Sequence, residues 1–153
     1  MAPRAASDQA TVLAFDFGTR RIGVAIGTTI VGVARPLTTI ADDANAARFA
    51  AVAALIDEWQ PDMLVVGLPV HADGAPHEMT ARAERFARQL EGRFGLKVAR
   101  VDERYTSQGA EDALVAAGAR AGERKAARDG VAAQLILQAW FDSPSREGTL
   151  DPA

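Results

Sequence analysis

Short apolar segments separated by polar turns fill the first forty residues of the chain. Residues 12–15 and 22–26 are apolar runs, joined by a polar turn that begins with Asp16 and contains glycine and two arginines. This pattern predicts a hairpin of two strands. Residues 28–40 are again rich in β-branched residues, and Pro36 indicates an edge position or the end of the strand. We therefore expect three antiparallel strands in succession.

Farther along the chain, apolar residues recur at helical spacing in some segments and form short continuous runs in others. Runs of the second kind are typical of strands covered on both faces of a sheet. The predicted elements are a helix from a cap at Asp42 or Asp43 to about Trp59, a strand over 62–68, a helix over 77–94, a strand over 97–103, a short helix from a cap at Thr106 or Ser107 to about residue 117, a loop over 118–124 and a final helix over 125–141.

This order predicts a mixed α/β fold. Three antiparallel strands followed by alternating helices and strands give a five-stranded sheet in βββαβαβα order, with a parallel half and helices on its faces. That is the element order of a ribonuclease-H-like fold. The 153 residues suit one domain. We place this domain at residues 11–142 and expect residues 1–10 and 143–153 to be disordered tails.

The composition narrows the class of protein. Hydrophobic residues make up 48% of the chain, as in a globular protein. Cysteine is absent, which excludes disulfides, thiolate zinc sites and a cysteine nucleophile. No apolar run is long enough to span a membrane, and the first residues lack the apolar segment of a signal peptide. We expect a cytoplasmic protein with no membrane partner.

Arginine supplies nearly all of the positive charge of the chain. The net charge is −3, which does not by itself favour nucleic acid as a partner. Of 17 basic residues, two are lysines and the others are arginines. Arginine suits bidentate phosphate contacts, although codon usage in a GC-rich genome explains the count equally well. The placement of the arginines is therefore more informative than their number.

Three acidic residues stand where a sheet of this kind binds ligands. Asp16 and Glu103 stand at the carboxyl ends of the first and last predicted strands, and ligands of open α/β sheets bind beyond such ends. Asp129 lies in line with Ala133 and Ile136 on the apolar side of the last helix. Two of these acids also have a structural explanation: Asp16 could cap its own turn, and Asp129 could favour the start of its helix. Their convergence on one edge is harder to explain without a ligand.

Carboxylates that repel one another need a cation between them. Oxygen ligands without cysteine suit Mg²⁺ or Mn²⁺, and two such ions about 4 Å apart can promote hydrolysis of a phosphodiester. Nearby basic residues could hold a nucleic-acid backbone, and hydroxyls at a helix start could take a phosphate. These candidate nucleic-acid-binding residues are Arg20, Arg21, Arg104, Thr106, Ser107, Arg124, Lys125 and Arg128.

An ordered set of short motifs resembles the YqgF family, also called RuvX. Each motif is weak alone, but together they run in order through nearly the whole domain and are highly specific. The matching segments are 16–25 (DFGTRRIGVA), 67–69 (GLP) with 73–74 (DG), 102–107 (DERYTS), Lys125, Asp129, 132–133 (AA) and 136–138 (ILQ).

The resemblance implies that Asp16, Glu103 and Asp129 are the catalytic, metal-binding acids. It implies a metal-dependent endonuclease acting on structured RNA in 5′-end processing of pre-16S rRNA, with the ribosome precursor as partner. A Holliday junction resolvase acting on branched DNA, as a monomer or a homodimer, would share the same site. The wider superfamily commonly has its second acid after the fourth strand, where this chain has Gly67, so Glu103 takes that place.

Two other function classes stay open. Residues 16–19 also resemble the phosphate loop of actin- and hexokinase-like proteins, but those clamp nucleotide between two related domains, and this chain has no internal repeat. A non-catalytic nucleic-acid-binding protein in transcription or ribosome maturation would need the arginines but not the three acids. The presence of all three acids favours the enzyme.

Overall fold

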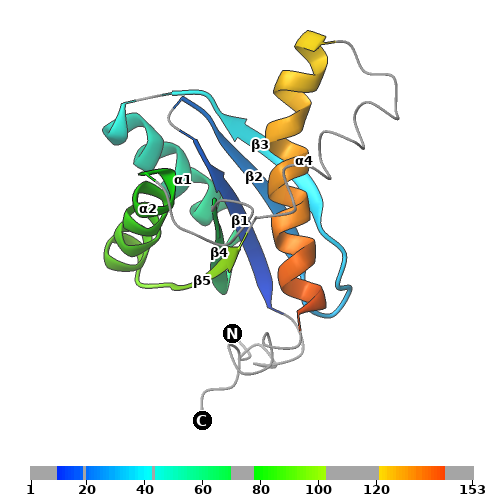
Figure 1. Ribbon diagram of the computed structural model, residues 1–153. Coiled ribbons are helices and arrows are strands. Elements are labelled where there is room, and N and C mark those ends of the chain that lie inside the picture. The colour runs from blue at the N-terminus through cyan, green and yellow to red at the C-terminus, as the bar shows by residue number, and fades with distance from the viewer. Residues whose placement is uncertain (1–9, 19, 43, 70–77, 103–120, 144–153) are drawn as a thin grey trace.

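The computed structural model describes residues 10–18, 20–42, 44–69, 78–102 and 121–143 (Figure 1). Its strands form one five-stranded sheet in the order β3-β2-β1-β4-β5. The elements are β1 (Thr11–Phe17), β2 (Ile22–Thr28), β3 (Arg35–Ile40), α1 (Asn45–Trp59), β4 (Met63–Leu68), α2 (Glu78–Phe94), β5 (Lys97–Asp102) and α4 (Ala121–Asp142).

The sheet is mixed, as the element order predicts. β1 lies at its centre, antiparallel to β2 and parallel to β4. β3 extends the antiparallel half and β5 extends the parallel half. The edge position expected from Pro36 is confirmed, because Pro36 lies in β3 opposite Ala25, next to a shift in register. The ribonuclease-H-like α/β arrangement is therefore confirmed.

Helices cover both faces of the sheet. α1 and α2 lie on one face, and α4 crosses the other (Figure 1). Side chains of a strand alternate between faces, so Leu13 and Phe15 of β1 pack in the core under α1 and α2, while Val12 and Ala14 pack in the core under α4. Burial on both faces explains why β1 and β4 are continuous apolar runs rather than alternating ones.

The third strand is shorter than predicted. Residues 28–40 were expected to be extended, but β3 begins at Arg35, after a turn in which the Gly32 N–H donates to the Thr28 carbonyl at 2.8 Å. Between this turn and β3, the backbone forms hydrogen bonds with two side chains of α4 instead of with a neighbouring strand. Gln138 accepts from the Ala34 N–H at 3.0 Å, and Gln134 donates to the Ala34 carbonyl at 3.1 Å. These bonds join residues a hundred positions apart, so local sequence does not reveal them.

The start of α1 also differs from the prediction. Its N-cap is Ala44, which makes no side-chain cap. The Asp42 carboxylate accepts from the Ala44 N–H at 2.9 Å, so it stabilises the turn before the helix and not the helix itself. Asp43 lies outside the described residues. The end of α1 is as expected, because Gln60 is left-handed there and Pro61 follows.

The last helix is longer than predicted. α4 begins at Ala121, so residues 121–124, expected to be loop, are helical. Alanine, glutamate and arginine are strong helix formers, and Gly122 alone does not stop them. The predicted helix over 106–117 and both tails, apart from residues 10 and 143, lie outside the described residues. None of the helices in the described part of the chain is long and apolar enough to cross a membrane.

Candidate functional site

Asp16 lies on the face of the sheet that α4 covers. Val12 and Ala14 of β1 are fully buried under that helix, and Asp16 is the next residue of the strand with the same orientation. It is half-buried and comes one residue before the strand ends. The structure therefore places a carboxylate at the carboxyl end of the central strand, where the sequence predicts it.

Both strands beside Asp16 have glycine at the neighbouring position. Asp16 pairs with Gly23 of β2. On the other side Phe15 pairs with Val66, which brings Asp16 next to Gly67 of β4. Neither glycine carries a side chain, so no strand side chain flanks the carboxylate at these two positions. Carboxylate oxygens are ligands that suit a hydrated divalent cation.

The other predicted acids are described only in part. Glu103 follows directly after β5 and lies outside the described residues, as do Arg104, Thr106 and Ser107. Asp129 lies on α4, but its side chain is not described, nor are those of Arg124, Lys125 and Arg128. Within the described part of the chain, no group of three acidic or histidine side chains gathers around a possible metal position.

The backbone of α4 agrees with the predicted place of Asp129. The residues in line with it, Ala133, Ile136 and Trp140, are all buried against the sheet. At the next residue, Gly130, an added Cβ would lie 3.3 Å from the Cβ of Pro36 in β3. The helix therefore lies close to the sheet at this level.

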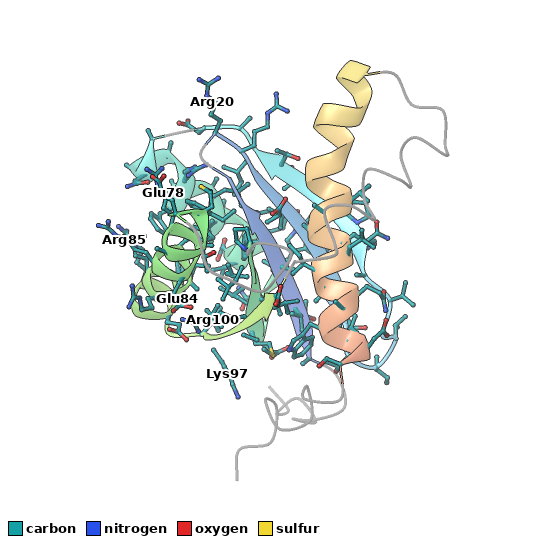
Figure 2. All side chains as sticks on the ribbon, in the orientation of Figure 1. Arg20, Glu78, Glu84, Arg85, Lys97 and Arg100 are labelled. Atoms are coloured by element: carbon teal, nitrogen blue, oxygen red, sulfur yellow. The ribbon has the colours of Figure 1, made fainter. Side chains whose placement is uncertain are left out.

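The turn after Asp16 carries two of the predicted arginines. Arg20 is exposed and Arg21 is half-buried, and Figure 2 shows Arg20 at the end of the hairpin between β1 and β2. A Cβ at Gly18 would lie 2.6 Å from the Arg21 carbonyl oxygen, closer than such atoms approach. Only glycine therefore fits this turn, which holds the two arginines near the carboxyl end of β1.

The sequence did not predict a buried arginine that supports this turn. Arg48 of α1 is 4% exposed, and its Nε donates to the Asp42 carbonyl at 2.7 Å. Its Nη2 donates to the Gly18 carbonyl, and its guanidinium lies 5.1 Å from the centre of the Phe17 ring. The available signal was its position four residues before Val52, on the apolar side of α1.

A second arginine, Arg100, forms an ion cluster with two glutamates of α2. Arg100 of β5 donates to Glu84 of α2 at 2.8 and 3.0 Å and to Glu91 at 2.9 and 3.2 Å (Figure 2). The hydrogen bonds that Arg100 donates to Glu91 and Glu84 raise the pKa of Arg100, although burial opposes them. The hydrogen bond from Arg100 likewise lowers the pKa of Glu91. This cluster therefore ties α2 to the edge of the sheet.

Close relatives share most of the chain. A protein from Chromobacterium violaceum is 58% identical over 133 residues, which cover 86% of this chain and 97% of the relative. One from Dechloromonas aromatica is 57% identical over 134 residues, covering 88% of this chain and 92% of the relative. Both carry the name "Putative pre-16S rRNA nuclease".

A solved structure shares this fold. RuvC from T. thermophilus, in complex with a Holliday junction substrate, superposes with a TM-score of 0.55 at 16% identity. The match covers 92% of this chain and 97% of that one and supports the ribonuclease-H-like fold. A family model described as "RuvX: Holliday junction resolvase" matches residues 10–143. The chain belongs to the RuvX family.

Proposed function

We propose that this protein is a metal-dependent endonuclease that hydrolyses phosphodiester bonds in 5′-end processing of pre-16S rRNA in the cytoplasm. The observation that carries the proposal is the position of Asp16, at the carboxyl end of the central strand and between Gly23 and Gly67. The names of the relatives supply the rRNA substrate.

In this proposal two further carboxylates gather beside Asp16. Ala99 and Val101 of β5 belong to the core under α4, so continued alternation would bring Glu103 to the same face. Asp129 would complete the set from α4, since it precedes the buried stripe of that helix. Together their oxygens would hold Mg²⁺ or Mn²⁺.

Each part of the site then has a chemical role. A bound divalent ion supplies the charge that activates a water and stabilises the leaving oxygen of the phosphodiester. The carboxylates orient the attacking water and accept its proton. Arg20 and Arg21, at the turn beside the site, would hold phosphates of the strand, with Arg104, Thr106, Ser107, Arg124, Lys125 and Arg128 as further proposed contacts.

The test compares two substrates. Cleavage of a pre-16S rRNA fragment and of a four-way DNA junction is measured side by side with Mg²⁺, Mn²⁺ or EDTA, using the wild type and Asp129→Asn. We expect metal-dependent cleavage of the RNA that the variant loses. RNA cleavage that persists in EDTA or in Asp129→Asn would contradict the proposed site.

A Holliday junction resolvase is the second candidate, favoured by the family description and by the resemblance to RuvC. Cleavage of the four-way junction instead of the RNA would establish it. Resolvases of this fold cut as dimers, so such a result would also predict a homodimer, whereas RNA processing is compatible with a monomer. Binding of both substrates without cleavage would indicate a non-catalytic nucleic-acid-binding protein.

A further inference from the structure

A cleft of about 290 Å³ lies between α1 and α2, on the opposite side of the sheet from α4. Three arginines line it: Arg48 from α1, and Arg82 and Arg85 from α2. The side-chain amides of Asn45 and Gln89 add polar groups. We call this feature the arginine cleft. Because none of its described lining residues is acidic, the cleft is suited to an anion.

Two of the arginines can be used by a ligand. Arg85 makes no hydrogen bond or ion pair with another described residue, and Figure 2 shows it projecting from α2. Arg82 pairs with Glu78 at 2.9 Å, but their side chains are 52% and 78% exposed. Exposed pairs of this kind contribute little free energy, so a phosphate can replace the glutamate.

The floor of the cleft is apolar and firmly packed. The Phe17 and Phe86 rings lie 5.0 Å apart between centroids, and the Phe49 and Phe86 rings 5.8 Å apart. Buried Arg48 lies over the Phe17 ring and donates hydrogen bonds to the backbone carbonyls of Gly18 and Asp42. An anion above this floor is partly shielded from water, which strengthens its interaction with the guanidinium groups.

The arginine cleft adjoins the proposed catalytic site across a single strand. Phe17 lines the cleft, and Asp16 is the preceding residue of β1. Consecutive residues of a strand point to opposite faces, and their Cα atoms are about 3.8 Å apart. A nucleic-acid strand that crosses the carboxyl edge of the sheet would therefore reach both sites.

We propose that the arginine cleft binds a backbone phosphate of the nucleic-acid substrate, outside the site of cleavage. The inference rests on the proposed function, because it takes the ligand to be the substrate strand. Arginine forks recognise phosphate oxygens without reading bases, so this contact positions the strand without selecting a sequence.

The first test is RNA binding by Arg85→Gln, with Arg88→Gln as the matched control. Arg88 lies one turn farther along α2, its side chain is 66% exposed, and it is not part of the cleft. Anisotropy of a labelled single-stranded fragment of the rRNA precursor is measured in EDTA over a range of KCl concentrations.

Loss of one phosphate contact is expected to weaken RNA binding about fivefold near 0.1 M KCl. The slope of log affinity against log KCl concentration should become shallower by about 0.7. Arg88→Gln is expected to change affinity less than about twofold, because an exposed charge outside a contact acts only through screened long-range attraction. Equal effects of the two substitutions, or no effect of Arg85→Gln, would overturn the proposal.

The second test changes affinity in the opposite direction. Glu78→Gln removes the carboxylate that competes for Arg82, so RNA binding should tighten about twofold. Glu58→Gln, on α1 and outside the cleft, removes the same charge elsewhere. An equal gain in both variants would reflect net charge alone and would count against the cleft.

A third arm separates the strand from a small phosphate ligand. Inorganic phosphate and AMP are titrated against wild type and Arg85→Gln. We expect only millimolar binding of either compound. Micromolar binding of AMP that depends on Arg85, with RNA binding unchanged by the substitution, would overturn the assignment to the substrate strand.

These outcomes are distinguishable from failure of the proposed function. If Asp129→Asn abolishes cleavage but Arg85→Gln leaves RNA binding unchanged, only the cleft assignment fails. If no cleavage occurs but RNA binding depends on Arg85 and not on Arg88, the nuclease proposal fails and the cleft remains a nucleic-acid contact.

Discussion

The two faces of the sheet are packed in different ways. Under α1 and α2 the core is built from large side chains, among them Phe15, Phe86 and Leu90. Under α4 the strands contribute small ones, such as Ala14 and Ala25. In the described part of the chain, one face thus has two helices over bulky residues, and the other has one long helix lying close to the strands.

The close approach of α4 depends on glycine as well as alanine. At Gly27 an added Cβ would lie 2.7 Å from the Phe141 ring and 2.9 Å from the Val33 carbonyl oxygen. Two further glycines, Gly23 and Gly67, flank Asp16 on the same face. Small residues therefore let the helix lie close to the strands, and no strand side chain flanks the carboxylate at Gly23 or Gly67. In our proposals the α4 face carries the cleavage chemistry, and the α1–α2 face supplies a large-residue core and the arginine cleft.

The largest expected loss of stability comes from the α1–α2 face. Leu90→Ala removes a fully buried side chain from that core. The free energy of unfolding should fall by about 3.5 kcal/mol through lost burial and a cavity, measured by urea denaturation. Cleavage per folded molecule should not change. A loss below about 1 kcal/mol would show that this core is not tightly packed.

Arg48 tests whether the α1–α2 face supports the turn after Asp16. Arg48→Met keeps the apolar bulk but removes the donors to the Gly18 and Asp42 carbonyls. We expect the free energy of unfolding to fall by about 2.5 kcal/mol, because both lost hydrogen bonds come from a charged donor. Arg93→Met is the control, because that exposed arginine only covers the Phe49 ring at 4.0 Å. Equal losses in the two variants would contradict the role given to Arg48.

Close packing under α4 is tested by Gly27→Ala. The added methyl group collides with Phe141 and Val33, so the free energy of unfolding should fall by about 2 kcal/mol. Gly92→Ala provides the contrast, because Gly92 lies in α2 with no neighbouring atom within 4 Å of the added carbon. That variant should gain about 0.7 kcal/mol from helix propensity. If Gly27→Ala left the free energy of unfolding unchanged, the close approach of α4 would be contradicted.

The smallest effect concerns pH and the ion cluster on α2. Arg100 lowers the pKa of Glu91 below its usual 4.5 in the folded state. The ionised carboxylate therefore stabilises the fold above the unfolded-state pKa, and this stability is lost as pH falls through the folded-state pKa. Because Glu91 is 40% exposed, the contribution is below about 1 kcal/mol.

Urea denaturation at two pH values measures this contribution. The stability difference between wild type and Glu91→Gln should be larger near pH 7 than in acid below the lowered folded-state pKa of Glu91, where the wild-type carboxylate is protonated. A difference that does not vary with pH would exclude the proposed ion pairing.

Periodicity predicted most of the fold. Apolar runs located β1, β2 and β4, and helical spacing located α1 and α2 with their ends at Trp59 and Phe94. The end of the first apolar run also located Asp16 at the carboxyl end of β1. These features follow from local patterns. Side chains recur on one face every two residues in a strand and every three to four residues in a helix.

Long-range contacts account for the features that sequence did not predict. The late start of β3 depends on Gln134 and Gln138, far along the chain. The role of Arg48 depends on a turn thirty positions earlier, at Gly18. The arginine cleft combines two helices that are separate in sequence, and no local pattern indicates which faces meet.

The central claim is that the Asp16 carboxylate supports metal-dependent cleavage. Its most direct test is the rate of pre-16S rRNA cleavage in Mg²⁺ by Asp16→Asn and by Asp57→Asn, which removes the same charge from the exposed surface of α1. We predict that Asp16→Asn abolishes cleavage while retaining the fold and RNA binding, and that Asp57→Asn cleaves like the wild type. Wild-type cleavage by a folded Asp16→Asn variant would contradict the account.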